Sequence, residues 1–408
     1  MKKPMSTYAS NERKNATPSG LVPRFLVVLF GTLEYDGRAQ RMIEVLASMG
    51  EVLLVDIVPA VRGSGDEYQR GQIQRHRVDL PHNLGKLGRH LRFWLEVIRV
   101  ARRYKPTVVV AEDFFTTFPA WLVAWMGKSH LIYDAYELII PEKGRKMSPR
   151  DAFWYYLERW VVPRADLVIA ANPERARLMA EHYGLRRTPE YMRNIPPQRP
   201  LDPSIHAEII RRYPALARKN AEDRIILYQG DVSLERGLAR FVQALAYLRP
   251  NYRLIVAGDG PDLGRLKELG EAWKKEGRFA TLGRVPHALL QAVSIRADVG
   301  IVTYPYEGLN NIYCAPNKLF EYAQAGLPVI ATDQPPLKAL VSEYRIGGVI
   351  SRDDAPADIA GALQHLVERR EYYRANLSRF LEAHRWEDEA ARLRRAIEHM
   401  LRVRSKDE

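Results

Sequence analysis

A lysine and a glutamate three residues apart could together hold a phosphorylated nucleoside. Lys318 and Glu321 stand in the stretch APNKLFEYAQAGLPVIATD, which runs from Ala315 to Asp333. Pro316 is suited to begin a helix, and residues three apart share one face of a helix. A lysine can pair with a diphosphate, while a carboxylate can accept both vicinal hydroxyls of a ribose. The alternative is a surface ion pair, worth less than about 1 kcal/mol.

Two turns after apolar runs carry further residues suited to binding phosphate. The run RIILYQ is followed by GDVSLERG, in which Gly230 opens the turn and Arg236 brings a guanidinium to the start of a helix. Backbone amides and a guanidinium can face an anion from such a turn. The run RLIVA is followed by GDGP, whose Gly258 and Gly260 permit close backbone approach. Taken singly, the alternatives are an exposed arginine that opens a helix and a tight turn that binds nothing.

Apolar runs and helical stretches alternate along both halves of the chain. In the first half the runs FLVVLFG, EVLLVDIV, 107–111, 130–134 and 166–170 are continuous, as in strands buried on both faces of a parallel sheet. In the second half the series is RIILYQ, RLIVAG, FATLG, DVGIVTY, PVIAT and GGVI. Ligands of such sheets bind beyond the carboxyl ends of the strands, where the turns above lie. The sequence therefore predicts an α/β protein with two doubly wound, Rossmann-like domains.

A proline-rich stretch of low periodicity, residues 188–214, separates the two series. We therefore expect one domain at 23–200 and a second at 201–380. Residues 1–22 are polar and predict a disordered leader. The last segment, 381–408, contains a long charged amphipathic helix with no strand after it, and we expect this helix to pack back on the first domain.

The composition fits a globular protein of a reducing compartment. The chain of 408 residues has one cysteine, Cys314, and no Cys/His cluster at zinc-ligand spacing. No apolar run reaches the roughly 18 residues of a spanning helix, so a cytoplasmic location is expected. Of the net charge of +13, residues 1–200 carry +10. Such an excess favours anionic lipid, acidic glycan or nucleic acid, the last being least expected because no nucleic-acid-binding module is present.

Residues 86–104, KLGRHLRFWLEVIRVARRY, predict a basic amphipathic helix. Arginines flank one apolar face, which comprises Leu87, Leu91, Trp94, Leu95 and Ile98. This pattern is typical of helices that lie on an anionic membrane surface. The alternative is an ordinary helix that packs this face on the sheet.

The order of YQGDVSLERG, LIVAGDGP, TLGRVP and APNKLFEYAQAGLPVIATD resembles the retaining GT-B glycosyltransferases of family 4, also called group 1, in an NKLFEY-type variant. FLVVLFGTLEYDGRAQRMIEVLASMG is similar to the opening strand, loop and helix of that family. IYDAYE and PRADLVIAANPERARLMAEHYG resemble its later strands, and HRWEDEAARL resembles the helix that returns to the first domain. The resemblance extends over about residues 24–400.

This resemblance implies a hexosyltransferase of polysaccharide biosynthesis that moves a sugar from a nucleoside-diphosphate sugar to a glycan or lipid-linked acceptor. It implies no cofactor and no metal, no nucleic-acid partner, and a place in the cytoplasm, peripheral on the inner face of the membrane. The implied catalytic residues are Arg236, Lys318 and Tyr136. The implied donor-binding residues are Gly230, Arg236, Gly258, Gly260, Arg284, Val285, Pro316, Asn317, Lys318, Leu319 and Glu321. The implied acceptor side comprises Asp36, Gly37 and Arg38.

Three positions depart from the family pattern. Tyr313 stands where the family often has a glutamate, eight residues before the ribose carboxylate, and Tyr136 stands where it has a histidine. Asp231 and Val232 follow Gly230, where a second basic residue is common. Tyrosine can donate a hydrogen bond to a sugar but is no base at neutral pH. A noncatalytic GT-B protein that only binds a nucleotide or glycan is therefore the alternative.

Overall fold

The computed structural model describes residues 22–58, 73–81, 83–142, 144–198, 205–218 and 220–404. Apart from Val22, the predicted leader lies outside the described residues. The chain forms two compact units. Unit 1 comprises the described parts of Met1–Ile139, Met147–Tyr191 and Ala390–Glu408, and unit 2 those of Ile140–Lys146 and Met192–Glu389. No helix within the described ranges combines the length and apolar character that crossing a bilayer requires.

Unit 1 is built on a parallel sheet whose strand order is β3-β2-β1-β4-β5-β6-β7. The strands are β1 (Arg24–Leu29), β2 (Glu51–Ile57), β3 (Ile73–Val78), β4 (Val108–Glu112), β5 (His130–Asp134), β6 (Leu167–Ala170) and β7 (Glu190–Tyr191). Phe25 of β1 pairs with Val52 of β2 on one side and with Val108 of β4 on the other. The strand order therefore reverses between β1 and β4.

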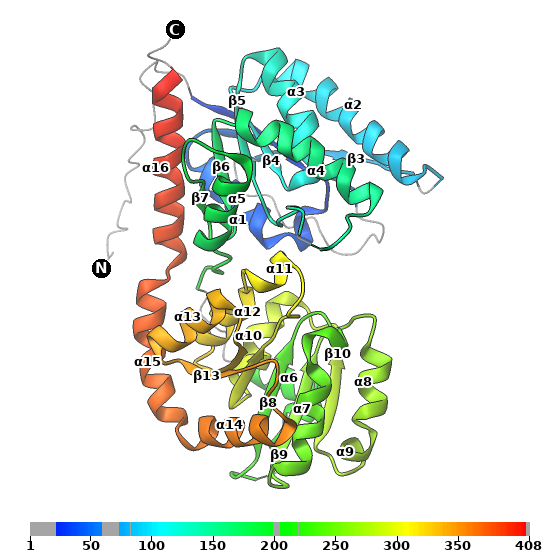
Figure 1. The fold of residues 1–408 in the computed structure, drawn as a ribbon, viewed down its shortest axis with the longest axis vertical. Coiled ribbons are helices and arrows are strands. Elements are labelled where there is room, and N and C mark those ends of the chain that lie inside the picture. Colours follow the sequence, from blue (N-terminus) through cyan, green and yellow to red (C-terminus); the bar gives the residue numbers. More distant parts are fainter. Residues whose placement is uncertain are drawn as a thin grey trace, which may run out of the picture. The chain divides into compact units, whose positions relative to one another are not determined.

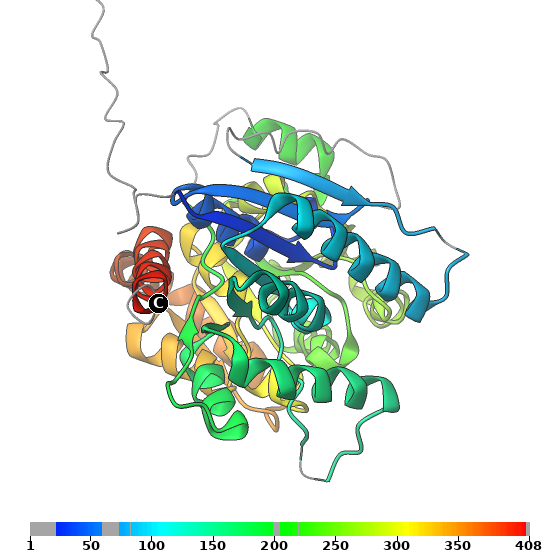
Figure 2. The same ribbon diagram turned by 90° about the horizontal axis from the view of Figure 1, so that it is seen from above.

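Helices cover the sheet of unit 1. They are α1 (Gly37–Ala47), α2 (Lys86–Tyr104), α3 (Thr117–Gly127), α4 (Pro149–Val161) and α5 (Pro173–Tyr183). Single turns of 3-10 helix lie at η1 (Leu33–Tyr35), η2 (Phe114–Thr116) and η3 (Val162–Arg164). Figures 1 and 2 show α2, α3 and α4 side by side, each packed against the next.

Unit 2 repeats the plan with strand order β10-β9-β8-β11-β12-β13. The strands are β8 (Arg224–Gln229), β9 (Tyr252–Ala257), β10 (Phe279–Gly283), β11 (Val299–Val302), β12 (Val329–Thr332) and β13 (Gly347–Ile350). Strand β8 pairs in parallel with β9 on one side and β11 on the other, so the order reverses between β8 and β11. Two parallel α/β units confirm the predicted fold class.

The helices of unit 2 enclose a core that includes Tyr228, Phe241 and Leu363. They are α6 (Ile205–Arg212), α7 (Leu238–Ala244), α8 (Leu263–Leu269), α9 (Glu271–Lys275), α10 (His287–Ile295), α11 (Leu309–Ile312), α12 (Asn317–Gln324), α13 (Pro335–Tyr344), α14 (Pro356–Glu368) and α15 (Arg370–Ala383). Turns of 3-10 helix lie at η4 (Pro214–Leu216), η5 (Leu234–Arg236) and η6 (Leu245–Tyr247).

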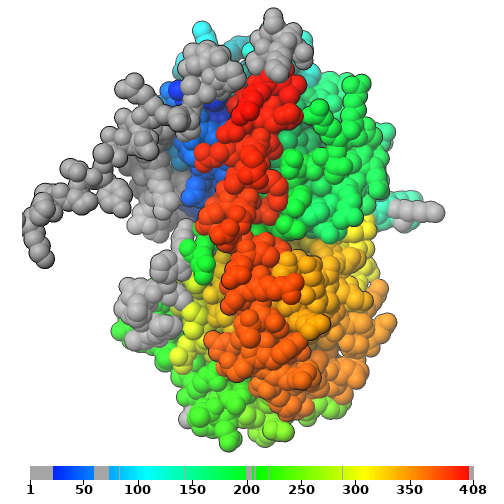
Figure 3. All heavy atoms as spheres, turned by 90° about the vertical axis from the view of Figure 1, so that its left-hand side faces the viewer, coloured from blue at the N-terminus to red at the C-terminus, as the bar shows by residue number. Residues whose placement is uncertain are grey.

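The last helix, α16 (Trp386–Arg404), begins in unit 2, and from Ala390 onward it belongs to unit 1. Arg392 Nη2 donates to the Tyr191 carbonyl at 2.5 Å, and Arg394 Nη2 donates to Ser48 Oγ at 2.6 Å. In Figure 3 this helix, in red, lies between the blue and green segments of unit 1.

The unit boundaries differ from the predicted domain limits. The first unit ends at Tyr191 rather than at residue 200, because Met192 and Ile195 are buried residues of the second unit. The proline-rich stretch also contains the short strand β7 and the helix α6, which its composition does not indicate.

Candidate functional site

The strand order reverses once in each sheet, and a reversal leaves a crevice beyond the carboxyl ends of the two strands. In unit 2 this crevice lies beyond β8 and β11, and in unit 1 beyond β1 and β4. The turn with Gly230 and Arg236 directly follows β8, and the loop leading to Lys318 follows β11. Asp36 and Arg38 follow β1, so both groups of predicted residues lie at reversal points.

The turns after β8 and β9 pack directly on each other. Gly230 has a φ of 123°, a left-handed conformation that favours glycine. A Cβ on Gly258 would overlap the carbonyl oxygen of Gly230, and one on Gly260 would overlap the backbone of Val232. Val232 N donates to the Asp259 carbonyl at 3.0 Å. The glycines of GDGP therefore allow one turn to fit against the other, whatever ligand is bound.

Two cations converge beside this turn. Lys318, in the first turn of α12, places Nζ 3.4 Å from Tyr228 Oη and 4.5 Å from the centre of that ring. A Cβ on Gly230 would lie 3.2 Å from the same Nζ. The guanidinium carbon of Arg236 lies 5.2 Å from the ring centre of Tyr304, and Lys318 Nζ lies 5.6 Å from it. The predicted lysine and arginine thus share one aromatic side chain.

Lys318 is held in a setting that disfavours its charge. Burial, followed by the positive charge of Arg236, lowers the pKa of Lys318 to about 7. Glu321 and Asp231 act in the opposite direction without cancelling the effect. Asp231 lies 3.6 Å from Arg236 Nε but is an exposed residue, where solvent weakens the ion pair. An anion that enters beside Gly230 would restore the charge of the lysine.

Glu321 is bound by a group that sequence reasoning missed. Its Oε2 accepts a hydrogen bond from Gln229 Nε2, the last side chain of β8. Gln229 Oε1 in turn accepts from Ser294 Oγ at 3.0 Å, and Gln229 N donates to Tyr322 Oη at 3.0 Å. The only sequence signal is a polar residue that closes the apolar run RIILYQ.

The remaining predicted donor residues differ in exposure. Asn317 is exposed at the start of α12, Leu319 is fully buried, and Pro316 is the N-cap residue. Arg284 is exposed and Val285 is buried. Both follow β10, which β9 separates from β8 in the sheet. Sheet order therefore does not bring Arg284 to the reversal point.

Tyr313 is the C-cap residue of α11 and is partly buried. It precedes α12 in the loop that follows β11. Asn194 Nδ2 donates to the Ala315 carbonyl at 3.4 Å in the same loop. Tyr313, which stands where the family often has a glutamate, therefore lies in the short connection between α11 and α12.

In unit 1 a buried ion pair joins the start of α1 to the end of β5. Arg38 Nε donates to Asp134 Oδ2 at 2.9 Å, and Nη2 donates to Oδ1 at 2.5 Å. Arg38 Nη2 also reaches the Ala170 carbonyl of β6 at 3.3 Å. Arg38 is 5% exposed and Asp134 is fully buried. Arg38, predicted on the acceptor side, therefore acts in this structure as a tie between strand ends.

The other predicted acceptor-side residues surround this ion pair. Asp36 Oδ1 caps α1 by accepting from Arg38 N at 3.1 Å and Ala39 N at 2.9 Å. Gly37 is exposed at the first position of the helix. Tyr136 Oη lies 3.4 Å from Asp36 Oδ1 and donates to Glu112 Oε2 at 2.7 Å. Tyr136 is thus part of one hydrogen-bonded group with Asp36.

Glu112, the last residue of β4, is the member of this group that sequence reasoning missed. It is 1% exposed, and its Oε2 accepts the hydrogen bond from Tyr136. Burial, followed by the negative charge of Asp134, raises the pKa of Glu112 well above its usual value. Asp134 itself is paired with Arg38.

Backbone strain marks the same strand end. Asp113 has a φ of 63° and a ψ of 168°. This region favours glycine and costs an aspartate on the order of 1–3 kcal/mol. Strained backbone conformations of this kind cluster at functional sites.

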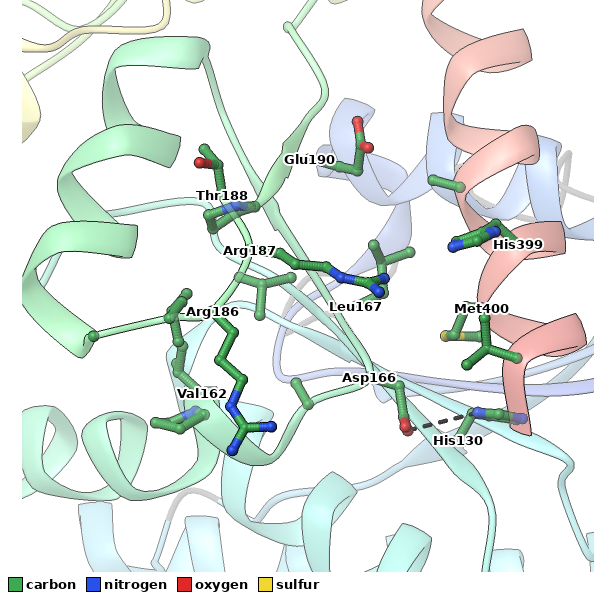
Figure 4. A pocket seen from close by; sticks show the side chains of 18 residues that line it. His130, Val162, Asp166, Leu167, Arg186, Arg187, Thr188, Glu190, His399 and Met400 are labelled. Atoms are coloured by element: carbon green, nitrogen blue, oxygen red, sulfur yellow. Dashed lines mark ion pairs between the residues drawn. The ribbon is translucent and has the colours of Figure 1, made fainter. Parts of the chain in front are cut away.

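A separate hollow of about 750 Å³ lies at the opposite, amino-terminal edge of the unit 1 sheet. Figure 4 shows it between the starts of β5 and β6 and the helix α16. His130 Nδ1 lies 3.7 Å from Asp166 Oδ2 in its wall. None of the predicted site residues lines it.

Two family models match the chain. The model described as "Glycosyl transferase 4-like domain" matches residues 37–194, and "Glycosyl transferases group 1" matches residues 211–380. One polypeptide of the phosphatidylinositol N-acetylglucosaminyltransferase of Arabidopsis thaliana is 29% identical over 112 residues. This match covers 28% of the chain and 21% of that protein, so the chain matches about a fifth of the relative's length.

Solved structures share the fold at low sequence identity. HepE from Anabaena, solved in complex with UDP and glucose, has a TM-score of 0.68 at 15% identity and covers 92% of this chain and 99% of its own. Sucrose-phosphate synthase from Thermosynechococcus elongatus has a TM-score of 0.69 at 16% identity, covering 93% and 100%. WaaG, a glycosyltransferase of lipopolysaccharide biosynthesis, has a TM-score of 0.64 at 14% identity, covering 91% and 98%.

The raised pKa of Glu112 predicts a pH-dependent stability. A carboxyl group whose folded pKa is raised contributes stability that is complete below its unfolded pKa near 4.5 and is lost as the pH rises through the folded pKa. Glu112→Gln has a similar shape and does not titrate. Urea unfolding from mildly acidic to alkaline pH should show that the free energy of unfolding of the variant rises relative to that of the wild type as the pH rises. Glu371→Gln, at an exposed position, is the control, and parallel curves for Glu112→Gln and the wild type would contradict a raised pKa of Glu112.

The lowered pKa of Lys318 predicts proton uptake when a nucleoside diphosphate binds. The bound anion favours the charged amine, so uptake should grow as the pH rises through 7, and affinity should fall by up to about tenfold per pH unit above 7. Calorimetry in buffers of different ionisation enthalpy measures the protons taken up. Lys318→Met should abolish the proton uptake that is due to the lysine. If the variant and the wild type take up the same number of protons, the proton binds to another group, such as the phosphate of the ligand.

Proposed function

The chain belongs to the GT-B glycosyltransferases of group 1 and family 4, and we propose that it is a hexosyltransferase that uses a nucleoside-diphosphate sugar. The acceptor is a glycan or a lipid-linked acceptor, and transfer retains the anomeric configuration without a metal ion. One observation carries this proposal. Lys318 and Arg236 converge over Tyr304 beside the glycine turn at the reversal point of the second sheet.

The two cations account for how the leaving group would be stabilised. Negative charge grows on the diphosphate as the glycosidic bond breaks, and preformed cations in a site of low dielectric lower the barrier most at that moment. Lys318 is desolvated before the substrate arrives, so its charge is poorly compensated until the diphosphate is present. The amides in the first turn of α12, from Asn317 to Leu319, add the positive end of a helix dipole. We infer that these groups take the place of a metal ion.

Glu321 is the group we assign to the ribose. Gln229 holds one carboxylate oxygen, and Ser294 fixes the orientation of Gln229. A carboxylate oriented in this way can accept the vicinal hydroxyls. The UDP complexes of HepE, which has the same fold, support a nucleotide as ligand.

For the acceptor side we propose Asp36 and Tyr136. Both lie at the reversal point of the first sheet, and Tyr136 Oη is oriented by Glu112 at 2.7 Å. The phenol stays protonated and donates its hydrogen to Glu112, so its oxygen can accept a hydrogen bond from a sugar hydroxyl. Burial raises the pKa of Tyr136 well above its usual value, which excludes the phenolate as a base at neutral pH.

We also propose that the protein works in the cytoplasm at the inner face of the membrane, where lipid-linked acceptors are found. The basic helix α2 supports this location through its electrostatic attraction to anionic lipid. The proposal includes no cofactor and no nucleic acid as partner.

Removing either cation should weaken donor binding. Arg236→Ala and Lys318→Ala each delete a charge-assisted contact worth about 1.5–3 kcal/mol, which corresponds to roughly 10- to 100-fold in affinity. Calorimetry with UDP, GDP and ADP sugars measures the effect. Lys338→Ala, an exposed lysine of α13, is the matched control. Unchanged affinity in both site variants would refute this donor site.

Binding and transfer are separated by a second measurement. The wild type should hydrolyse or transfer the sugar above background, and both variants should lose this activity together with binding. Donor binding without any turnover, over a panel of glycan and lipid-linked acceptors, would instead favour a noncatalytic binding protein.

A further inference from the structure

The large apolar side chains that remain exposed are concentrated on three neighbouring helices. Of fourteen such side chains in the described residues, eight lie on α2, α3 and α4. They are Leu87, Leu91, Leu95, Trp125, Met126, Phe153, Tyr156 and Trp160. We call this surface the three-helix face. Single exposed apolar side chains are common on protein surfaces, whereas a group of them on neighbouring helices marks an interaction site.

The face is continuous because aromatic rings connect the helices. Trp94 of α2 lies 5.0 Å from Phe118 of α3, measured between ring centres. Trp121 of α3 lies 4.2 Å from Trp160 of α4 and 6.0 Å from Trp125. The helices lie side by side in two perpendicular views (Figures 1 and 2). The ring contacts therefore join the exposed side chains of α3 and α4 to α2.

Helix α2 has two apolar stripes, and only one of them faces the protein. The buried stripe comprises His90, Phe93, Val97, Ala101 and Tyr104. Leu87, Leu91 and Leu95 follow one another at intervals of four residues and are 66%, 47% and 68% exposed. The alternative, in which these leucines pack on the sheet, is therefore wrong. The stripe from His90 to Tyr104 packs against the protein instead.

Positive charge surrounds the exposed apolar side chains. The exposed basic residues on or next to these helices are Lys86, Arg92, Arg99, Arg102, Arg103, Lys105, Lys128, Arg150, Arg159 and Arg164. Of the acidic residues on the same helices, Glu158 is buried, Glu96 is partly buried beside Arg99, and Asp151 is exposed. The face therefore combines tryptophans and leucines with a large excess of positive charge.

We propose that the three-helix face docks on a membrane surface that contains anionic lipids. Tryptophan, tyrosine and leucine side chains enter the interface between headgroups and acyl chains, and arginines pair with lipid phosphates. Contact between two copies through this same face would place arginines opposite arginines, which disfavours a homodimer. This proposal rests on the membrane location proposed above and extends the membrane contact from α2 to α3 and α4; it does not depend on the donor site.

Flotation with lipid vesicles tests the proposal. The full-length wild type should float with vesicles of phosphatidylcholine and phosphatidylglycerol, bind vesicles of phosphatidylcholine alone at least tenfold less, and release at high salt. Leu91→Ser with Leu95→Ser tests α2, and Trp125→Ala with Tyr156→Ala tests α3 and α4. Each pair should reduce binding at least tenfold. Tyr247→Ala and Leu269→Ala, at exposed positions of unit 2, are the matched controls and should leave it unchanged.

Three outcomes would overturn the proposal. A wild type that never floats would exclude a membrane surface. Loss of binding in the α2 pair but not in the α3 and α4 pair would restrict the contact to one helix. A change of oligomeric state in either pair, measured by sedimentation, would assign the face to a protein interface. Thermal melts and nucleotide binding of each variant verify its fold, so loss of flotation stays distinguishable from loss of the proposed donor binding.

Discussion

Parallel pairing sends the carboxyl ends of all strands in a sheet to one edge, and the functional groups of both units depend on this constraint. Where the strand order reverses, neighbouring connections leave in opposite directions and a crevice remains. Lys318 reaches from α12 to the turn after β8 across this crevice. In unit 1 the buried pair of Arg38 and Asp134 ties the start of α1 to the end of β5. Both arrangements follow from sheet topology rather than from local sequence.

The residues at the reversal point of unit 2 are mainly cationic, whereas those of unit 1 are mainly acidic, and burial shifts their pKa values in opposite directions. In unit 2 two cations share one tyrosine ring, and the lysine responds with a lowered pKa. In unit 1 the carboxyl groups of Glu112 and Asp134 are both buried, and burial raises the pKa of Glu112. A pair of cations favours an anionic ligand, whereas phenol and carboxyl groups form hydrogen bonds with neutral hydroxyl groups. This difference fits a charged donor substrate and an uncharged acceptor group.

The sequence predicted the fold and the two cations because both depend on local patterns. Continuous apolar runs identify buried strands. The turn that carries Arg236 directly follows one of these strands, and Lys318 lies on the connection between two others. The strand β3, IQRHRV, was missed because an edge strand with polar side chains has no apolar run. Glu112, Gln229 and Ser294 were missed because their partners are distant in sequence. Periodicity also could not decide which stripe of α2 packs inward, since both stripes recur at helical spacing.

The path of α16 has a consequence for the order of folding. Unit 1 includes Ala390–Arg404, which follow all of unit 2 in the chain, while unit 2 includes Ile140–Lys146 from within the first half. A nascent chain leaves the ribosome from its amino end, so the sheet of unit 1 can pair early but lacks its last helix until unit 2 has been made. Neither unit is a contiguous segment that can be excised without loss.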